Sequence, residues 1–108
     1  MQDTLIALYE VALKRKNEPS EGSYTCYLYD KGIDKILKKI GEECTETIIA
    51  AKNNDNEDTV LEICDLIYHL MIMMVQQGIC LEDVTAELEK RSEKTGNLKS
   101  MRVTDKNT

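Results

Sequence analysis

The sequence predicts an all-α fold, a helical bundle of about five helices. Apolar residues recur at intervals of three and four along most of the chain, and no segment shows the alternation that marks a strand. Short polar or glycine-containing breaks at 19–22, 30–32 and 53–56 divide the helical segments. The length of 108 residues is that of one ordinary domain.

Start and stop signals place the first two helices. Asp3 or Thr4 is expected to cap the first helix, and Pro19 ends it because proline cannot continue a helix. Ser23 is placed to cap a short second helix over residues 24–29. A polar linker therefore separates these two helices.

The next three helices differ in how much of their surface is apolar. The third is predicted over residues 34–52 and carries a single apolar stripe. The fourth, over residues 57–77, is apolar nearly all round and is stopped by Gly78, so we expect it to be buried on every side. A fifth helix is predicted over residues 81–92.

Composition limits the compartment and the partners. Residues 1–99 are expected to form the domain, and residues 100–108 a polar, loosely ordered tail. A net charge of −6 and a pI near 4.8 disfavour binding to nucleic acid or an anionic membrane. The apolar run at 63–75 is shorter than the ~20 residues of a membrane span, and no signal-peptide pattern opens the chain. Four widely spaced cysteines are interpreted as reduced core residues. We expect a cytoplasmic protein.

Three polar side chains of the fourth predicted helix share one face. At about 100° per residue, Glu62, Asp65 and His69 fall within a wedge of roughly 60°, and apolar residues cover the rest of the circumference. An unpaired buried carboxylate costs several kcal/mol, so such acids require a partner. The pattern predicts that the partner is a cation.

The third predicted helix supplies further acids. Its E-E-x-x-E cluster is formed by Glu42, Glu43 and Glu46, and an antiparallel hairpin would bring the last two opposite Glu62 and Asp65. Four converging carboxylates raise one another's pKa values or bind a divalent cation, and hard oxygen ligands favour Mg²⁺, with Mn²⁺ as a substitute. The alternative for the E-E-x-x-E cluster alone is a solvated helix face.

Basic residues gather beside these acids in a chain that is otherwise acidic. Lys38 and Lys39 precede the cluster, and Lys52 ends the same helix. Lys38 and Lys39 are placed to contact phosphate oxygens while a metal ion neutralises others. The alternative is that the lysines balance the acidic face, for instance through a Lys39–Glu43 pair one turn apart.

His69 is interpreted as a residue that supports the metal site rather than a ligand. A single histidine among apolar residues more often makes hydrogen bonds in the core or behind a metal ligand than it binds the metal. A di-iron carboxylate centre is disfavoured, because such bundles use Glu-x-x-His spacing and His69 follows Asp65 by four positions.

The two acidic helices resemble a known group of enzymes. K-K-I-G-E-E-C-T-E at 38–46 and E-I-C-D-L-I-Y-H-L at 62–70 are similar to the all-α nucleoside triphosphate pyrophosphohydrolases of the MazG type, which carry E-x-x-E and E-x-x-D. Within that superfamily, five motifs resemble the phosphoribosyl-ATP pyrophosphatase family, and the resemblance extends to about Lys99. The motifs are S-Y-T at 23–25, K-K-x-G-E-E, A-A-K at 50–52, D-L-x-Y-H-L and E-L-E-K-R at 87–91.

The resemblance implies an activity and a set of site residues. The reaction would be hydrolysis of 1-(5-phosphoribosyl)-ATP between the α and β phosphates, in the second step of histidine biosynthesis. Glu43, Glu46, Glu62 and Asp65 would hold magnesium, with Glu42 in the outer shell or on a second ion. The residues that would contact the nucleotide or its phosphates are Lys38, Lys39, Lys52, Ser23, Tyr24, Thr25 and Arg91.

The chain departs from the family pattern at two places. Cys44 and Thr45 stand where small aliphatic residues are usual, and the segment 94–99 only loosely matches the usual Ser-Gly-bearing end. Neither departure touches the carboxylates.

The remaining expectations concern the proton acceptor, assembly and competing functions. Glu43 or Glu46 is the expected acceptor of a proton from the attacking water. Family members are homo-oligomers, so we expect a dimer or a dimer of dimers. One alternative is a house-cleaning pyrophosphohydrolase that acts on dUTP or noncanonical nucleotides, and another is a non-enzymatic helical interaction module whose acids only confer solubility.

Overall fold

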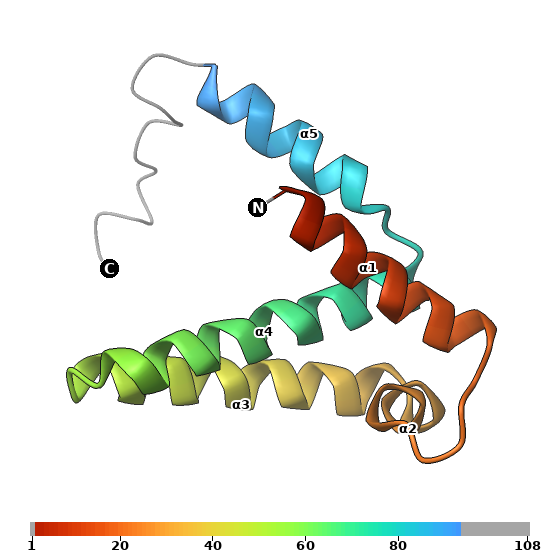
Figure 1. The fold of residues 1–108 in the computed structure, drawn as a ribbon, viewed down its shortest axis with the longest axis horizontal. Coiled ribbons are helices and arrows are strands. Elements are labelled where there is room, and N and C mark those ends of the chain that lie inside the picture. The colour runs from red at the N-terminus through yellow and green to blue at the C-terminus, as the bar shows by residue number, and fades with distance from the viewer. Residues whose placement is uncertain (1, 94–108) are drawn as a thin grey trace.

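The computed structural model describes residues 2–93, and within that range the chain forms five helices and no strand. The predicted all-α fold is confirmed (Figure 1). The tail expected at 100–108 lies outside the described residues. The helices are α1 (Gln2–Asn17), α2 (Tyr24–Lys31), α3 (Ile33–Lys52), α4 (Asn56–Gln77) and α5 (Leu81–Ser92).

Helices α3 and α4 form a long antiparallel hairpin, the largest unit of the fold (Figure 1). Residues 53–55 make the turn, in which Asn54 adopts the left-handed conformation at φ 58°. Asp55 caps α4, since its carboxylate accepts a 3.0 Å hydrogen bond from the backbone N–H of Asp58. At the other end Gly78 stops α4 with φ 75°, as predicted. The hairpin therefore fixes how the two acidic segments face each other.

The core lies at one end of this hairpin, where α1 and α2 pack against it (Figure 1). Ala12, Leu28, Ile36 and Ile72, one residue from each of α1 to α4, are completely buried there. The Tyr29 hydroxyl donates a 2.8 Å hydrogen bond to the Ala12 carbonyl. Burial of apolar surface contributes about 25 cal/mol of stabilising free energy per Å². This buried cluster is therefore the main stabilising unit of the fold.

The prediction that α4 is buried all round is wrong for its N-terminal half. Met71 and Ile72 are buried in the C-terminal half, but Val60, Leu61 and Ile63 are 58%, 62% and 42% exposed. Helices α1 and α2 reach only the end of the hairpin away from the turn, so within residues 2–93 the first half of α4 packs against α3 alone (Figure 1). The hydropathy of a helix does not report how many neighbours it has.

One local prediction needs correction and another is confirmed. Helix α1 begins at Gln2, so Asp3 and Thr4 lie in its first turn and do not cap it. Ser23 does cap α2, because its hydroxyl accepts a 3.2 Å hydrogen bond from the backbone N–H of Cys26. Within residues 2–93 no helix is long and apolar enough to cross a membrane.

The cysteines are not the core residues that the sequence suggested. All four are free thiols, and the three that are exposed are Cys44, Cys64 and Cys80. Cys44 and Cys64 belong to the hairpin, much of whose surface is not covered by the described residues.

Candidate metal centre and phosphate site

Three carboxylates meet between α3 and α4. Glu43 from α3 and Glu62 and Asp65 from α4 can each place one oxygen within 4.8 Å of the others. Glu62 and Asp65 are three residues apart and share one helix face, and the antiparallel hairpin turns that face towards Glu43. The predicted convergence of E-x-x-D with an acid of the third helix is therefore seen in the structure.

Two oxygens of this cluster are buried without a partner. Glu43 is only 6% exposed, and among the described residues neither its Oε2 nor the Oε1 of Glu62 has a hydrogen-bond partner. A buried carboxylate oxygen that lacks a partner costs several kcal/mol unless it is protonated or contacts a cation. The donor set, all carboxylate oxygen, is the chemistry that binds Mg²⁺ or Mn²⁺.

The electrostatics of the cluster show the same excess of negative charge. Burial, followed by the hydrogen bond to Glu43 and the charge of Glu46, raises the pKa of Glu62 to about 7. Burial and then the charge of Glu46 raise the pKa of Glu43 as well. Glu46, the fourth predicted ligand, thus lies beside both residues, although it is exposed and stands outside the group of three. A divalent cation would relieve this repulsion.

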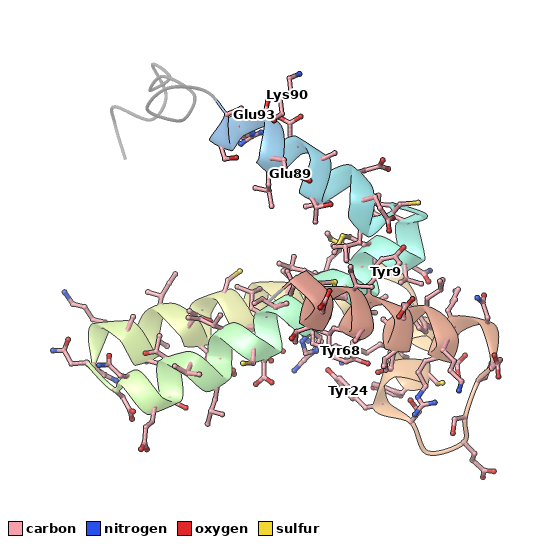
Figure 2. All side chains as sticks on the ribbon, turned by 45° about the horizontal axis from the view of Figure 1, so that its top comes forward. Tyr9, Tyr24, Tyr68, Glu89, Lys90 and Glu93 are labelled. Atoms are coloured by element: carbon pink, nitrogen blue, oxygen red, sulfur yellow. The ribbon has the colours of Figure 1, made fainter. Side chains whose placement is uncertain are left out.

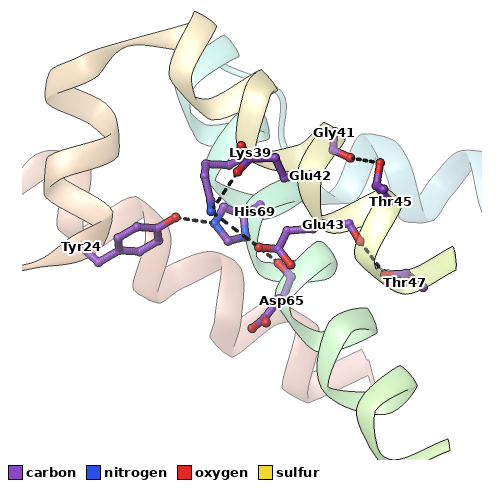
Figure 3. A network of polar contacts seen from close by, with 9 residues as sticks. All are labelled: Tyr24, Lys39, Gly41, Glu42, Glu43, Thr45, Thr47, Asp65 and His69. Carbon is purple, nitrogen blue, oxygen red and sulfur yellow. Dashed lines mark hydrogen bonds and ion pairs between the residues drawn. The ribbon is translucent and has the colours of Figure 1, made fainter. Parts of the chain in front are cut away.

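Lys39 is the cation that faces this cluster. Its Nζ lies 3.2 Å from Oε1 of Glu42 and 3.9 Å from Oε1 of Glu43 (Figure 3). The hydrogen bond from Lys39 lowers the pKa of Glu42, so Glu42 is held as a carboxylate on the lysine side of the cluster. The charge-balancing pair between Lys39 and Glu43 that the sequence left as an alternative is therefore present.

Glu42 and Glu46 also border a shallow hollow on the outer face of α3. The hollow measures about 420 Å³, and its other lining residues are Lys38, Gly41 and Thr45. Lys38 thus lies on the same face as two of the predicted site acids. The ammonium of Lys38 and the carboxylates of Glu42 and Glu46 are exposed at the edge of this hollow.

His69 is buried next to the carboxylates and contacts two elements. Its Nε2 lies 2.8 Å from the Tyr24 hydroxyl of α2, and its Nδ1 lies 2.7 Å from the Asp65 carbonyl oxygen (Figure 3). Beside it, the hydroxyls of Thr25 and Tyr68 are 2.6 Å apart. Tyr24 and Tyr68 project into the space between α2 and α4 (Figure 2).

Sequence reasoning did not identify Tyr68 as a partner of the site segment. The available signal was its position next to His69 on a buried helix, because a buried tyrosine hydroxyl nearly always has a hydrogen-bond partner.

The other predicted contact residues are not gathered around the cluster. Lys52 is exposed at the end of α3, next to the hairpin turn. The Ser23 hydroxyl caps α2, and Thr25 is buried in its contact with Tyr68. Arg91 pairs at 3.0 Å with Glu87 on α5, which extends away from the hairpin (Figure 1).

Comparison with known proteins gives one consistent result. A sequence model of the family described as phosphoribosyl-ATP pyrophosphohydrolase matches residues 5–92. A phosphoribosyl-ATP pyrophosphatase of Clostridium botulinum strain Hall is 55% identical over 98 residues, 91% of this chain and 89% of that protein. Proteins of the same name from Clostridium novyi and Streptococcus gordonii are 53% and 55% identical over 100 and 94 residues, which cover 93% and 87% of this chain and 91% and 90% of theirs. The chain belongs to the phosphoribosyl-ATP pyrophosphohydrolase family.

Proposed function

We propose that the chain hydrolyses 1-(5-phosphoribosyl)-ATP between the α and β phosphates. The products are 1-(5-phosphoribosyl)-AMP and pyrophosphate, and the reaction is the second step of L-histidine biosynthesis. The names of the relatives and a match over residues 5–92 support this substrate. The match covers nearly all of the described chain, which supports a single catalytic domain over residues 1–99.

The proposed cofactor is Mg²⁺, with Mn²⁺ as a substitute. Its ligands are Glu43, Glu62 and Asp65, with Glu46 as the fourth and Glu42 in the outer shell or on a second ion. The unpartnered buried oxygens of Glu43 and Glu62 are the observation that carries this proposal. When bound, the ion supplies charge neutralisation for the phosphates and lowers the pKa of a coordinated water.

Glu46 is the better acceptor for the proton of the attacking water. It is exposed, it borders Glu43 and Glu62, and it lines the hollow on α3. Glu43 is buried within the group of three, so its oxygens have less access to solvent than those of Glu46. A carboxylate that reaches both the cluster and solvent can take a proton and release it to water.

Cationic side chains bind the phosphates in this proposal. Lys39 already stands at the cluster edge, and Lys38 lies on the same side of α3. Lys52, at the hairpin turn, is assigned to the far end of the polyphosphate. The segment with Ser23, Tyr24 and Thr25 is assigned to the nucleotide, and Arg91 would come from a second subunit, because its own α5 extends away from the hairpin.

The proposed assembly is a homodimer or a dimer of dimers. Four large apolar residues at the turn end of the hairpin are more than half exposed; they are Ile48 (67%), Ile49 (53%), Val60 (58%) and Leu61 (62%). An apolar surface that no element of the described chain covers is the usual site of subunit contact. A second copy packed on this surface would lie next to the carboxylates of the first.

The deciding experiment compares substrates under saturating Mg²⁺. We expect turnover of 1-(5-phosphoribosyl)-ATP to exceed that of dUTP and of ordinary nucleoside triphosphates by at least about 100-fold, which is ~2.7 kcal/mol of transition-state discrimination. Preference for dUTP would instead support a house-cleaning enzyme. Loss of all hydrolysis together with an unchanged melting temperature on adding Mg²⁺ would support a non-enzymatic module. Glu62→Gln serves as the inactive control.

A further inference from the structure

We propose that a hollow beside α2, the tyrosine hollow, binds the purine base of the substrate, and that its acidic edge selects a positively charged, N1-substituted adenine. Tyr27 supplies stacking surface together with Tyr24, and Glu21 and Asp30 supply the charge. The proposal rests on the proposed function, because that function supplies the purine nucleotide as the ligand.

The tyrosine hollow lies between α2 and the linker that precedes it. Linker residues 19–23 line it together with Tyr24, Cys26, Tyr27 and Asp30 of the helix. The backbone N–H of Ser20 donates a 3.2 Å hydrogen bond to the sulfur of Cys26, which fastens the linker against α2. The hollow measures about 530 Å³. Small-molecule sites measure ~300–1,000 Å³, so this volume is enough for a purine base.

Two exposed tyrosine rings border this hollow. Tyr24 is 47% and Tyr27 43% exposed, and neither belongs to the buried core cluster. Their ring centroids are 6.4 Å apart, and the ring planes differ by only 27°. Two nearly parallel rings offer aromatic surface of a single orientation to a planar ligand, and nucleobases stack on tyrosine in this way.

Direct contacts connect the tyrosine hollow to the carboxylate cluster. The Tyr24 hydroxyl lies 2.8 Å from Nε2 of His69, and the two rings are edge to face with centroids 5.7 Å apart (Figure 3). Nδ1 of His69 lies 2.7 Å from the carbonyl oxygen of Asp65, which belongs to the group of three carboxylates. These distances hold whichever ring nitrogen carries the proton. A nucleotide whose phosphates lie at the cluster can therefore reach the hollow with its base.

The edge of the tyrosine hollow is acidic. The two charged residues that line it, Glu21 and Asp30, are both exposed, and within residues 2–93 neither forms a salt bridge. The basic residues at the end of α1 border a separate, smaller hollow. Nζ of the exposed Lys31 lies 5.7 Å from the centroid of the Tyr27 ring, so this ring already has a cation over one face. The hollow therefore suits a positively charged base and not a phosphate.

The proposed substrate carries a base of this kind. In 1-(5-phosphoribosyl)-ATP a sugar phosphate is attached to N1 of adenine, and substitution at N1 makes the amidine of the ring more basic. The base is then protonated in neutral solution, whereas the base of ATP is uncharged. Tyrosine faces and carboxylates both attract the positive charge, so the hollow favours the N1-substituted nucleotide over ATP.

A binding experiment tests the hollow without hydrolysis. The probes are 1-methyladenosine, which is N1-substituted and positively charged, and adenosine, which is neither; no metal or phosphate is added. At pH 7 we expect 1-methyladenosine to shift the ring NMR signals of Tyr24 and Tyr27 and to bind at least about fivefold more tightly than adenosine. Equal binding of the two nucleosides, or shifts that leave these two rings unchanged, would overturn the proposal.

Removal of the two edge charges tests the selection separately. The double variant Glu21→Gln and Asp30→Asn keeps the shape of both side chains, and both residues are exposed, so the helix content should not change. We expect it to bind the two nucleosides with affinities within about twofold of each other. A preference for 1-methyladenosine as large as that of wild type would contradict the role of the acidic edge.

The kinetic test removes the Tyr27 ring. We expect Tyr27→Leu to raise the KM for 1-(5-phosphoribosyl)-ATP about tenfold, with kcat within about twofold of wild type. The conservative Tyr27→Phe keeps the ring and should restore most of the affinity. Inorganic triphosphate has no base, so its inhibition constant should be the same for Tyr27→Leu and wild type. A wild-type KM in Tyr27→Leu, or an equal loss of affinity for triphosphate, would overturn the proposal.

The two assays distinguish failure of the base site from failure of the proposed function. Binding of 1-methyladenosine at the two rings, together with no hydrolysis of 1-(5-phosphoribosyl)-ATP, would support the base site and refute the function. Hydrolysis without binding of 1-methyladenosine at these rings would support the function and refute the base site. The nucleoside titration uses the wild-type chain, so it decides even if Tyr27→Leu does not fold by circular dichroism.

Discussion

The two ends of the α3–α4 hairpin both carry large apolar residues but have different surroundings. At the end packed by α1 and α2, Ile36 and Ile72 are completely buried. At the turn end, Ile48 and Leu61 on the same two helices are 67% and 62% exposed. Among the described residues, the first end is packed by α1 and α2, whereas the second leaves large apolar side chains exposed.

The carboxylate cluster lies at the border between these two ends. Glu43 is buried, while Asp65 and Glu46 are exposed. On the packed side, His69 joins α2 to the helix that carries Asp65. On the other side, Asp65 and Glu46 are open to solvent. Five predictions test whether the two ends differ in this way, from the largest expected effect to the smallest.

Loss of a cluster carboxylate should have the largest effect. Glu62→Gln preserves shape but removes one charge and one oxygen ligand from the border, and we expect kcat/KM to fall by at least about 1,000-fold, ~4 kcal/mol. Glu57→Gln, at the exposed start of the same helix, is the matched control and should keep full activity. Initial rates with saturating Mg²⁺ measure both, and equal activity of the two variants would place the catalytic site elsewhere.

Large-to-small changes at the two ends should differ in their effect on folding. Ile72→Ala opens a cavity in the packed end and should lower the free energy of unfolding by about 3 kcal/mol. In a variant kept monomeric, Leu61→Ala at the turn end should cost less than about 1 kcal/mol, because its side chain is already exposed. Urea denaturation followed by circular dichroism gives both values. Similar losses would mean that the turn end is packed within the monomer.

A charge at the turn end should affect assembly more than folding. Leu61→Glu places a carboxylate on the exposed apolar surface, and we expect the subunit dissociation constant to rise by about 100-fold, ~2.7 kcal/mol. The helix content should stay the same. Sedimentation at micromolar concentration distinguishes the species, with the exposed Glu82→Lys on α5 as a control for altered charge. A wild-type protein that sediments as a monomer would show that the exposed apolar surface at the turn end is not a subunit contact.

The carboxylate cluster should make the stability of the fold depend on pH, and a metal ion should reverse that dependence. The pKa of Glu62 is about 7 in the fold against 4.5 ordinarily, so between these values the folded chain holds a proton that the unfolded chain has released. Stability should therefore fall as pH rises through this window. Melting curves at pH 5.5 and 8 should show this loss, Mg²⁺ should restore stability at pH 8, and both effects should weaken in Glu62→Gln. A melting temperature at pH 8 that Mg²⁺ leaves unchanged would argue against the metal site.

A single hydrogen bond in the packed end should have the smallest effect. The Tyr9 hydroxyl donates a 2.8 Å hydrogen bond to the Ile79 carbonyl and ties α1 to the segment after α4. Tyr9→Phe should lower the free energy of unfolding by about 1 kcal/mol without changing catalysis. Tyr27→Phe, at a half-exposed ring on α2, is the control and should be neutral. An activity loss in Tyr9→Phe would show that the packed end does more than support the site.

Local signals in the sequence sufficed for much of the fold and for the acidic half of the site. The Ser23 cap and the Gly78 stop were predicted and are present, since each depends on a few neighbouring residues. Glu43 and Asp65 were predicted to meet, because a short turn allows only an antiparallel hairpin.

Features that depend on distant contacts were not predictable in this way. The Tyr24–His69 bond joins residues 45 positions apart, and it depends on how α2 packs. The exposure of Val60 was missed because hydropathy identifies apolar surface without showing where α1 and α2 end. Asp3 was predicted to be a cap because aspartate is favoured both at the N-cap and within the first turn of a helix, so the sequence alone does not distinguish the two positions.

The three-residue turn at 53–55 also bears on how the molecule folds. All three residues of the carboxylate group belong to one hairpin, so closing a single short loop is enough to bring them together. Contacts of this kind form fast compared with those that must wait for α1, some 60 positions before its partners on α4, to dock. We therefore expect the repulsion among the acids to be present early in folding, so that magnesium accelerates folding as well as stabilising the folded chain.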